Sequence, residues 1–290
     1  MIGENQVDWN ESGIASRQTP SKQGLEYYAP TTQDEAERMK NQAPGYYYFA
    51  GGTIINWKGD PRGKGLIDLK HLGLDVIDLS PDQTVIGAMT TIQTIAAHRK
   101  LPNALTGSAK LFSSRNIRNM ATLGGTVAGQ FFVSDVLPIL IGFKAEAEYF
   151  QNGSKRTMPL VQWLSEKPGL LCAVVLRHQQ RTVSFRQDKI AQTDFPLIVT
   201  AIGCEWNGAK LAEPVIAVSG ASGKLKVSES GAAYLARQLP SALDFRELYS
   251  LVQADIPSVG NVKATARVKR GIIESHLKSL IAELQKEGRS

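Results

Sequence analysis

The chain has 290 residues, 42% of them hydrophobic and 21% charged, which is the composition of an ordinary globular protein with a sizeable core. Its formal net charge of +6 comes from scattered lysines and arginines with no basic helix, which argues against a nucleic-acid-binding protein. No apolar run approaches the length of a membrane span and the N-terminus lacks an apolar signal core, so we expect a cytoplasmic protein.

The first part of the chain leads to a glycine motif. Residues 1–24 are polar and have no hydrophobic period, which predicts a disordered tail. Thr32 and Glu35 have the spacing of a capping box and predict a helix over residues 34–40. An aromatic strand over residues 46–49 then runs into a turn made by Ala50, Gly51, Gly52, Thr53 and Ile54.

Short elements follow between this turn and the centre of the chain. Residues 66–69 and 84–87 have the pattern of short strands. Thr90 with Gln93 predicts a capped helix over residues 92–100 that Pro102 closes.

The central stretch, residues 113–135, carries a second pair of glycines between hydroxyl residues. Because Gly124 and Gly125 have no Cβ, we expect a turn with exposed backbone N–H groups, free to adopt positive φ angles and open to a bulky anion. Ser134 and Asp135 then begin an apolar run over residues 136–143 that predicts a helix capped by Ser134. The alternative for this stretch is a hairpin turn followed by a capped helix, without any ligand.

The second half of the chain is predicted to be a set of strands followed by helices. Asn-Gly pairs at 152–153 and 207–208 predict hairpins, and Ile273, Leu277, Leu280 and Leu284 predict one apolar face of a C-terminal helix. This order predicts an α+β fold. Strands are expected over residues 145–150, 170–176, 183–186 and 196–206, two of which contain Cys172 and Cys204 as buried thiols.

Three motifs together resemble the FAD-binding subunit of the molybdenum hydroxylases, the family that includes the xanthine dehydrogenase and carbon monoxide dehydrogenase flavoproteins. The order and the spacing of the motifs both match that family. The chain departs from the usual family pattern at two positions. The family commonly has an aspartate or asparagine where this chain has Ile54, and an asparagine where it has Thr126. The matching motifs are Ala50-Gly51-Gly52-Thr53, Ile117-Arg118-Asn119 with Thr122-Leu123-Gly124-Gly125-Thr126, and Ser134-Asp135-Val136-Leu137-Pro138.

The resemblance implies a domain organisation. It implies a two-part FAD-binding domain of the vanillyl-alcohol-oxidase (PCMH) type over residues 25–190, with subdomains at about 25–85 and 86–190. A C-terminal α+β domain with a small antiparallel sheet and helices would follow over residues 191–290.

The resemblance also implies the cofactor and the residues that bind it. The FAD pyrophosphate would lie between the two glycine motifs, and further contacts would come from an aromatic side chain, an acid, a leucine and a cation. Neither a metal site nor a catalytic residue of the chain itself is expected. The implied cofactor-binding residues are Ala50, Gly51, Gly52, Thr53, Ile54, Phe112, Thr122, Gly124, Gly125, Thr126, Asp135, Leu170 and Arg186.

The function that the resemblance implies is electron transfer within a complex. An iron–sulfur chain with two [2Fe-2S] clusters and a molybdopterin-binding large subunit would be the partners, with NAD or another acceptor receiving the electrons. Two cysteines are too few for a cluster, so these centres would lie on separate polypeptides. The alternatives are a non-catalytic subunit that has lost FAD and a stand-alone flavin oxidoreductase of the same fold.

Overall fold

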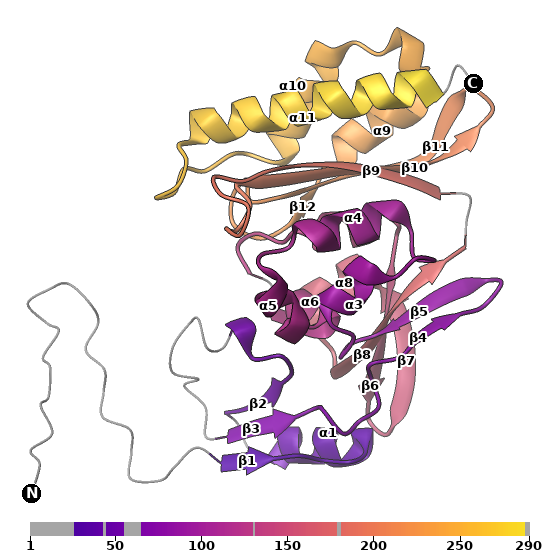
Figure 1. The fold of residues 1–290 in the computed structure, drawn as a ribbon. Coiled ribbons are helices and arrows are strands. Elements are labelled where there is room, and N and C mark those ends of the chain that lie inside the picture. The colour runs from indigo at the N-terminus through magenta and orange to yellow at the C-terminus, as the bar shows by residue number, and fades with distance from the viewer. Residues whose placement is uncertain (1–25, 43–44, 55–64, 130, 179–180, 288–290) are drawn as a thin grey trace, which may run out of the picture.

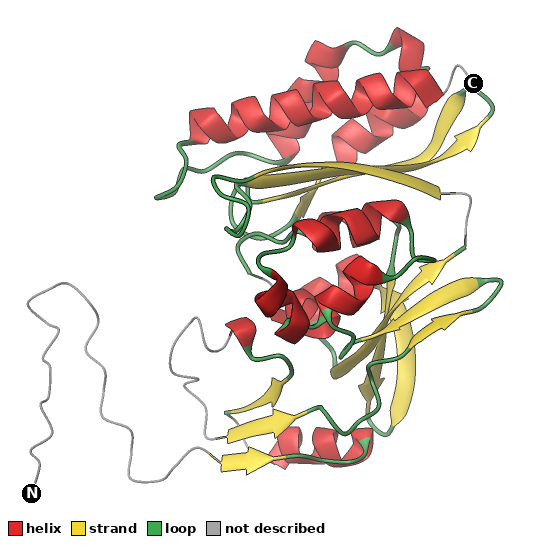
Figure 2. Ribbon diagram, in the orientation of Figure 1, coloured by secondary structure: helices red, strands yellow, loops and turns green. Residues whose placement is uncertain are grey.

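The computed structural model of the chain describes residues 26–42, 45–54, 65–129, 131–178 and 181–287, and arranges them in layers around three sheets (Figure 1). The predicted tail, residues 1–24, lies outside the described residues. Strands and helices alternate through the layers (Figure 2), which confirms the α+β fold class. No helix in the described part of the chain is both long and apolar enough to cross a membrane.

The N-terminal layer is a small parallel sheet with one helix. Thr32 caps the helix as predicted, since its Oγ1 accepts the Glu35 backbone N–H at 3.2 Å. Tyr46 to Phe49 form a strand with the predicted bounds, and it ends at the first glycine motif. The elements are β1 (Glu26–Tyr28), α1 (Gln33–Gln42), β2 (Tyr46–Phe49) and β3 (Gly65–Asp68), in the sheet order β1-β3-β2.

The middle layer is a five-stranded antiparallel sheet that is covered by short helices. The hairpin predicted at Asn152-Gly153 joins β6 to β7, where Gln151 pairs with Ser154. The strands, in sheet order, are β4 (Ile77–Leu79), β5 (Gln83–Gly87), β8 (Leu170–Arg177), β6 (Glu146–Gln151) and β7 (Ser154–Pro159). The helices are α3 (Ile92–Ala97), α4 (Asn103–Leu111), α5 (Arg115–Met120), α6 (Leu123–Gly129), α7 (Leu137–Gly142) and α8 (Leu160–Glu166).

The C-terminal layer is a four-stranded antiparallel sheet. Helices α9 to α11 cover one face, while α7 and α4 of the middle layer pack against the other (Figure 1). Because both faces are covered, Ile198 to Cys204 are buried without interruption. The strands, in sheet order, are β12 (Lys226–Val227), β11 (Lys210–Ser219), β10 (Ile198–Asn207) and β9 (Arg181–Asp188). The helices are α9 (Glu229–Arg237), the 3₁₀ helix η2 (Pro240–Ala242), α10 (Phe245–Asp255) and α11 (Ala266–Glu287).

The sheets divide the chain at other points than the expected domain boundaries. The boundary expected at residue 190 left β9 with the FAD-binding domain, but β9 pairs with β10 of the C-terminal sheet. Likewise, the boundary expected near residue 85 falls inside β5, which belongs entirely to the middle sheet. Strand pairing, which the sequence pattern does not reveal, decides both points.

Several local predictions are confirmed. The second hairpin joins β10 to β11 at Asn207-Gly208, where Asn207 pairs with Lys210. The apolar face predicted for the C-terminal helix is buried at all four positions in α11. Cys172 and Cys204 are buried thiols in β8 and β10, and burial raises the pKa of Cys172 to about 12.

The predicted helix over residues 92–100 is wrong in its cap and in its end. Thr91, not Thr90, is the N-cap, and its Oγ1 accepts the Thr94 backbone N–H at 3.0 Å. Thr90 is buried instead, and its carbonyl accepts the Leu123 N–H at the start of α6. The helix ends at Ala97 because His98 is already extended.

The helix after Ser134 begins one residue later than predicted, at Leu137. The N-cap is Val136, which makes no side-chain cap hydrogen bond, so the predicted cap at Ser134 is wrong. The Ser134 Oγ nevertheless accepts the backbone N–H groups of Val136 at 3.3 Å and Leu137 at 3.2 Å. The Ser134 N–H also donates to Ser219 Oγ at 2.8 Å, which ties this start to the C-terminal sheet.

Candidate functional site

Three adjoining cavities lie between the layers, and the largest joins the two glycine motifs. This central cavity has a volume of about 230 Å³. Its walls come from segments about seventy residues apart in the chain. The first segment contributes Tyr47, Tyr48, Ala50, Gly51, Gly52, Thr53 and Ile54, and the second contributes Thr122, Gly125, Ala128 and Gly129.

Two of these glycines are required by close approach. A Cβ on Gly51 would lie 1.7 Å from the Met120 carbonyl oxygen, so only glycine lets the first motif pack against the end of α5. A Cβ on Gly125 would lie 2.9 Å from Thr122 Oγ1 and 3.9 Å from the Ala50 Cβ, in the space between the two motifs. A larger side chain at Gly125 would therefore occupy the central cavity.

The second motif differs from the turn expected at Gly124 and Gly125. Both glycines lie in the first turn of α6, and neither has a positive φ angle; Gly52 of the first motif does, at 66°. Gly124 donates its N–H to the Ala88 carbonyl at 2.7 Å, and a Cβ there would lie 2.7 Å from the Ala88 Cβ. Gly124 is thus a packing glycine.

The backbone N–H groups of the second motif are also already paired. Leu123 donates to the Thr90 carbonyl, Gly125 to Thr122 Oγ1 at 3.1 Å, and Thr126 to the Thr122 carbonyl. The expectation of several exposed N–H groups at this motif is therefore wrong. The hydroxyl groups of Thr122 and Thr126 keep a proton to donate, and they are what this side offers to an anion.

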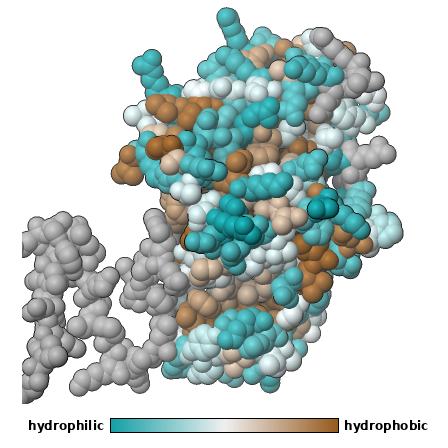
Figure 3. Space-filling model, in the orientation of Figure 1, coloured by the Kyte–Doolittle hydropathy of each residue, from teal (hydrophilic) through white to brown (hydrophobic). Residues whose placement is uncertain are grey.

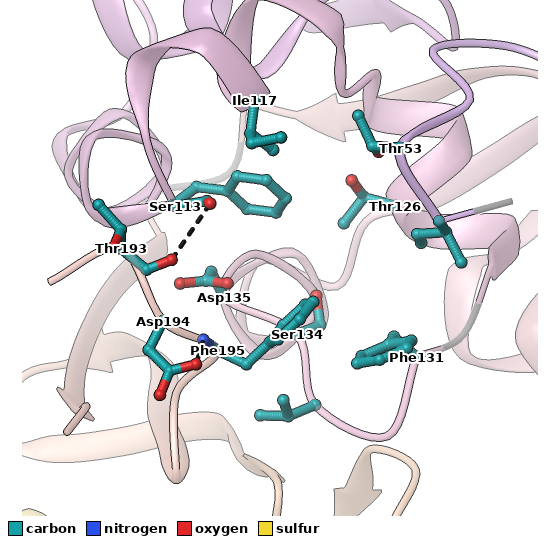
Figure 4. A pocket seen from close by; sticks show the side chains of 13 residues that line it. Thr53, Ser113, Ile117, Thr126, Phe131, Ser134, Asp135, Thr193, Asp194 and Phe195 are labelled. Atoms are coloured by element: carbon teal, nitrogen blue, oxygen red, sulfur yellow. Dashed lines mark hydrogen bonds between the residues drawn. The ribbon is translucent and has the colours of Figure 1, made fainter. Parts of the chain in front are cut away.

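The second cavity, of about 180 Å³, is the aromatic cavity and shares Thr53 and Ile54 with the central one. The rings of Phe131 and Phe195 stack with centroids 4.6 Å apart. In Figure 4 the side chains of Thr53 and Thr126 lie at one side of the cavity and Asp135 at the other. Its walls are Thr53, Ile54, Phe112, Ser113, Ile117, Thr126, Phe131, Val133, Ser134, Asp135, Thr193, Asp194 and Phe195.

Asp135 is the buried acid of the aromatic cavity, with only 4% of its surface exposed. The Lys189 Nζ lies 2.8 Å from its Oδ1, and Gln187 Nε2 donates to the same oxygen at 2.7 Å. Burial raises the pKa of Asp135 above its ordinary value, and the Lys189 ammonium and the Gln187 amide oppose the rise. The carboxyl is therefore held in place by two side chains of the β9 segment.

The third cavity, of about 90 Å³, is the Leu170 cavity. It shares Tyr48, Ala50, Gly125 and Ala128 with the central cavity, so the three cavities form one continuous run. Leu170 begins β8 and is 2% exposed. Its other walls are Leu69, Ala88, Met89, Gly124, Trp163, Gly169 and Leu171.

Every candidate site residue except Arg186 lines one of the three cavities. Arg186 instead donates to Ser279 Oγ at 2.9 Å and pairs with Glu283 of α11 at 2.7 Å. Side chains alternate along β9, so Gln187 faces Asp135 while Arg186 faces the C-terminal helix. Lys189, beyond the strand end, is the cation that pairs with Asp135 of the aromatic cavity.

Sequence reasoning included Phe112 but missed the other two aromatic residues of this cavity, Phe131 and Phe195. Phe131 stands only four residues before Asp135, so its position next to the serine–aspartate motif could have identified it as a site residue. Thr193 and Phe195 had no such signal, because they lie in the β9–β10 loop, which the sheet pairing brings to the cavity. Within the described residues, no three histidine, cysteine or carboxylate side chains form a group that could hold a metal ion.

Comparison with known sequences identifies relatives of this chain. Residues 22–177 match the family described as the FAD binding domain in molybdopterin dehydrogenase. The chain is also 27% identical over 180 residues to the uncharacterized protein YgfM of Escherichia coli strain K12, an alignment that covers 61% of this chain and 68% of YgfM.

Solved structures share the fold along most of the chain. Quinoline 2-oxidoreductase from Pseudomonas putida 86 superposes with a TM-score of 0.78 at 15% identity, covering 92% of this chain and 99% of that one. A carbon monoxide dehydrogenase chain from Hydrogenophaga pseudoflava gives 0.79 at 19% identity, covering 88% and 95%. At such identities the likeness establishes the fold.

Proposed function

The chain belongs to the family of FAD-binding domains of molybdopterin dehydrogenases, and we propose that it holds FAD along the three cavities as the electron-transfer subunit of a molybdenum hydroxylase complex. The observation that carries this proposal is the central cavity, which two glycine motifs far apart in the chain line together. A ligand with an extended, doubly charged middle suits a central cavity with little side-chain bulk on its walls and a further cavity at each end.

The central cavity would hold the pyrophosphate. Gly51 and Gly125 keep its walls free of side chains, and a Cβ at Gly125 would fill part of the space. The hydroxyl groups of Thr53, Thr122 and Thr126 are donors within reach of the same run of cavities. The residues present therefore fit a diphosphate.

The two ends of the run differ in size, which supports an assignment of the two ring systems. The aromatic cavity is about 180 Å³ and the Leu170 cavity about 90 Å³, so the larger isoalloxazine is assigned to the aromatic cavity and the smaller adenine to the other. Phe112, Phe131 and Phe195 offer flat apolar walls to a fused ring and exclude water from it.

Bound FAD would supply the capacity to take single electrons from an iron–sulfur centre and to release two to an acceptor. The chain's own residues would set the charge and the polarity around the flavin ring. Asp135 and Lys189 hold one another by an ion pair at the cavity wall, so each is positioned whether or not the cavity is filled. Lys189 would favour a negative charge on the ring, and Asp135 would limit that effect.

The partners in this proposal are an iron–sulfur subunit and a molybdopterin-binding subunit on separate chains, with NAD or another molecule as the final acceptor. The structural relatives support such an assembly, since they include the Cu,Mo-CO dehydrogenase, which superposes with a TM-score of 0.79 at 19% identity. The complex in this proposal is a xanthine dehydrogenase-like or related molybdenum hydroxylase.

A surface beside the aromatic cavity suits such a partner. Lys263 pairs with Asp194 of the cavity wall at 2.5 Å, which brings the loop between α10 and α11 to the cavity. Figure 3 shows hydrophobic surface over this loop and the start of α11. Its exposed apolar residues are Val259, Val262 and Val268, and nearer the cavity are Leu111, Ile117, Phe132 and Ile190.

The first experiment is to purify the chain and to precipitate it with acid. We expect a yellow protein that releases all its flavin to the supernatant as FAD. Among the described residues that line the three cavities, none is a histidine or cysteine that could attach the flavin covalently. A colourless protein that takes up no added FAD would contradict the proposal. Release of FMN in place of FAD would contradict the role of the central cavity.

The second experiment separates a subunit from a stand-alone enzyme. We expect the isolated chain to transfer few electrons from the organic substrate of the complex, and the added iron–sulfur and molybdenum subunits to restore substrate-dependent bleaching of the flavin. Undiminished turnover of an N-heterocycle or aldehyde by the chain alone would instead establish a stand-alone oxidoreductase.

A further inference from the structure

The turn between α4 and α5 forms one wall of the aromatic cavity and is strained. Phe112 and Ser113 both line the cavity. Ser113 has a φ angle of 38°, in the left-handed region that a residue with a Cβ rarely adopts. Its Oγ donates to the Thr193 carbonyl at 3.2 Å, at one side of the cavity (Figure 4). Something in the surroundings must hold this conformation, since the isolated turn would relax.

Arg118 is the group that holds it. The last carbonyls of a helix have no partner within the helix, and α4 ends at Leu111. The Arg118 Nη1 donates to the carbonyls of Lys110 at 3.2 Å, Phe112 at 3.0 Å and Ser113 at 2.9 Å. Its Nε donates to Gln93 Oε1 at 2.9 Å, which fixes the guanidinium against α3.

We propose that Arg118 is a positioning residue for the flavin ring: it holds the Phe112–Ser113 wall of the aromatic cavity and does not bind the phosphates. The proposal rests on the proposed function, since it assigns the isoalloxazine to that cavity. The alternative role for an arginine six residues before Gly124 is that of a phosphate ligand. The contacts to three carbonyl oxygens direct its charge to α4 instead.

Charge and shape both suit arginine at this position. A cation at the carboxyl end of a helix is favoured by the helix dipole, which α4 presents towards Arg118. The planar guanidinium carries several donors in a fixed geometry, so it can contact α4 and Gln93 at once. Replacing Arg118 with glutamine removes the charge and most of the hydrogen-bond donors. Glutamine also has a high helix propensity, so α5 should be retained.

The first test compares FAD with ADP as probes in Arg118→Gln. We expect the affinity for FAD to fall by about ten- to a hundredfold, because a charged hydrogen-bonding group is lost from the wall. The affinity for ADP should stay within about twofold, since the wall lies at the isoalloxazine end. The matched control is Arg115→Gln, an exposed arginine on the same helix, which should leave both affinities unchanged.

The second test asks whether strain relief replaces the arginine. Glycine adopts the φ angle of Ser113 without a steric penalty. Adding Ser113→Gly to Arg118→Gln should therefore recover FAD affinity about fivefold. In the flavin-free protein, Arg118→Gln should speed amide hydrogen exchange over residues 109–117, and the added glycine should slow it again. This second readout does not depend on any cofactor.

The outcomes separate the possibilities. Equal losses of FAD and ADP affinity would make Arg118 a phosphate ligand and would overturn the proposal, as would an unchanged FAD affinity or a failure of the glycine to rescue. A wild-type protein that binds ADP but no FAD would refute the proposed function itself. The exchange measurement would still decide whether Arg118 holds the turn.

Discussion

The C-terminal domain and the cleft formed by the three cavities differ in how their polar groups are paired. In the C-terminal domain, two buried cations, Arg181 and Lys269, are paired with backbone carbonyl groups. Arg181 donates to the carbonyls of Gly142, Gly203 and Glu213 at 2.6, 3.2 and 2.8 Å. Buried Lys269 donates to the Gly220 carbonyl at 2.7 Å, and burial lowers its pKa.

The cleft instead keeps space and polar groups for a ligand. Gly125 lines the central cavity, and Thr126 lines the aromatic cavity. A closed set of contacts contributes to stability, whereas glycines and free hydroxyls contribute little to it. Substitutions in the two regions should therefore separate folding from cofactor binding.

The largest expected effect is that of Gly125→Val on the cleft. The branched side chain would occupy the central cavity, so FAD affinity should fall by more than about a hundredfold. Gly125 has a helical conformation that valine can adopt, so the effect comes from the volume of the side chain, which also displaces Thr122 Oγ1, 2.9 Å from the new Cβ. Flavin content after purification and FAD titration measure the effect.

The matched control for this variant is Gly271→Val in α11, where a Cβ would meet nothing within 4 Å. It should keep a full complement of FAD. Full FAD content in Gly125→Val as well would show that the central cavity is not a pyrophosphate site.

The converse effect is expected for Arg181→Met in the C-terminal domain. Losing this buried cation would leave three carbonyl oxygens without their donor and would lower the free energy of unfolding by about 3 kcal/mol. The dissociation constant of FAD should change little in the folded fraction. Chemical denaturation measures stability, and Arg156→Met, an exposed position on β7, is the control. An equal stability loss in both variants would contradict the role of Arg181.

A smaller and sharper comparison uses two threonines. Thr126→Val removes a hydroxyl from the aromatic cavity and should weaken FAD binding by about fivefold while the melting temperature stays nearly constant. Thr200→Val removes the hydroxyl that lies 3.1 Å from His276 Nδ1, and should lower stability by about 1 kcal/mol with no effect on FAD. The opposite assignment of the two effects would overturn the contrast between the regions.

The smallest expected effect is a pH dependence at His276. Burial lowers its pKa below 6.5, although the hydrogen bond to Asp188 opposes this. The unfolded chain therefore binds a proton that the folded chain resists, and stability should fall as the pH drops below about 6.5. In His276→Gln the loss of melting temperature between pH 7.5 and 5.5 should be smaller. An identical pH profile would exclude this residue as the cause.

The sequence by itself determined what depends on neighbours in the chain. The β2 strand over residues 46–49, the Thr32 cap, the two Asn-Gly hairpins and the apolar face of α11 all follow from local spacing. The resemblance of the glycine motifs also identified the family, because a motif is itself a local pattern.

Only the tertiary structure decided which side chains meet. Arg186 and Lys189 are three residues apart, and strand alternation together with sheet pairing sends the first to α11 and the second to Asp135. The same pairing brings Phe195 against Phe131. The packing of α6 on Ala88 places Gly124 and Gly125 at the start of a helix, where the sequence predicted a turn. Contacts between distant segments depend on how the sheets assemble, and no local pattern of the sequence records that.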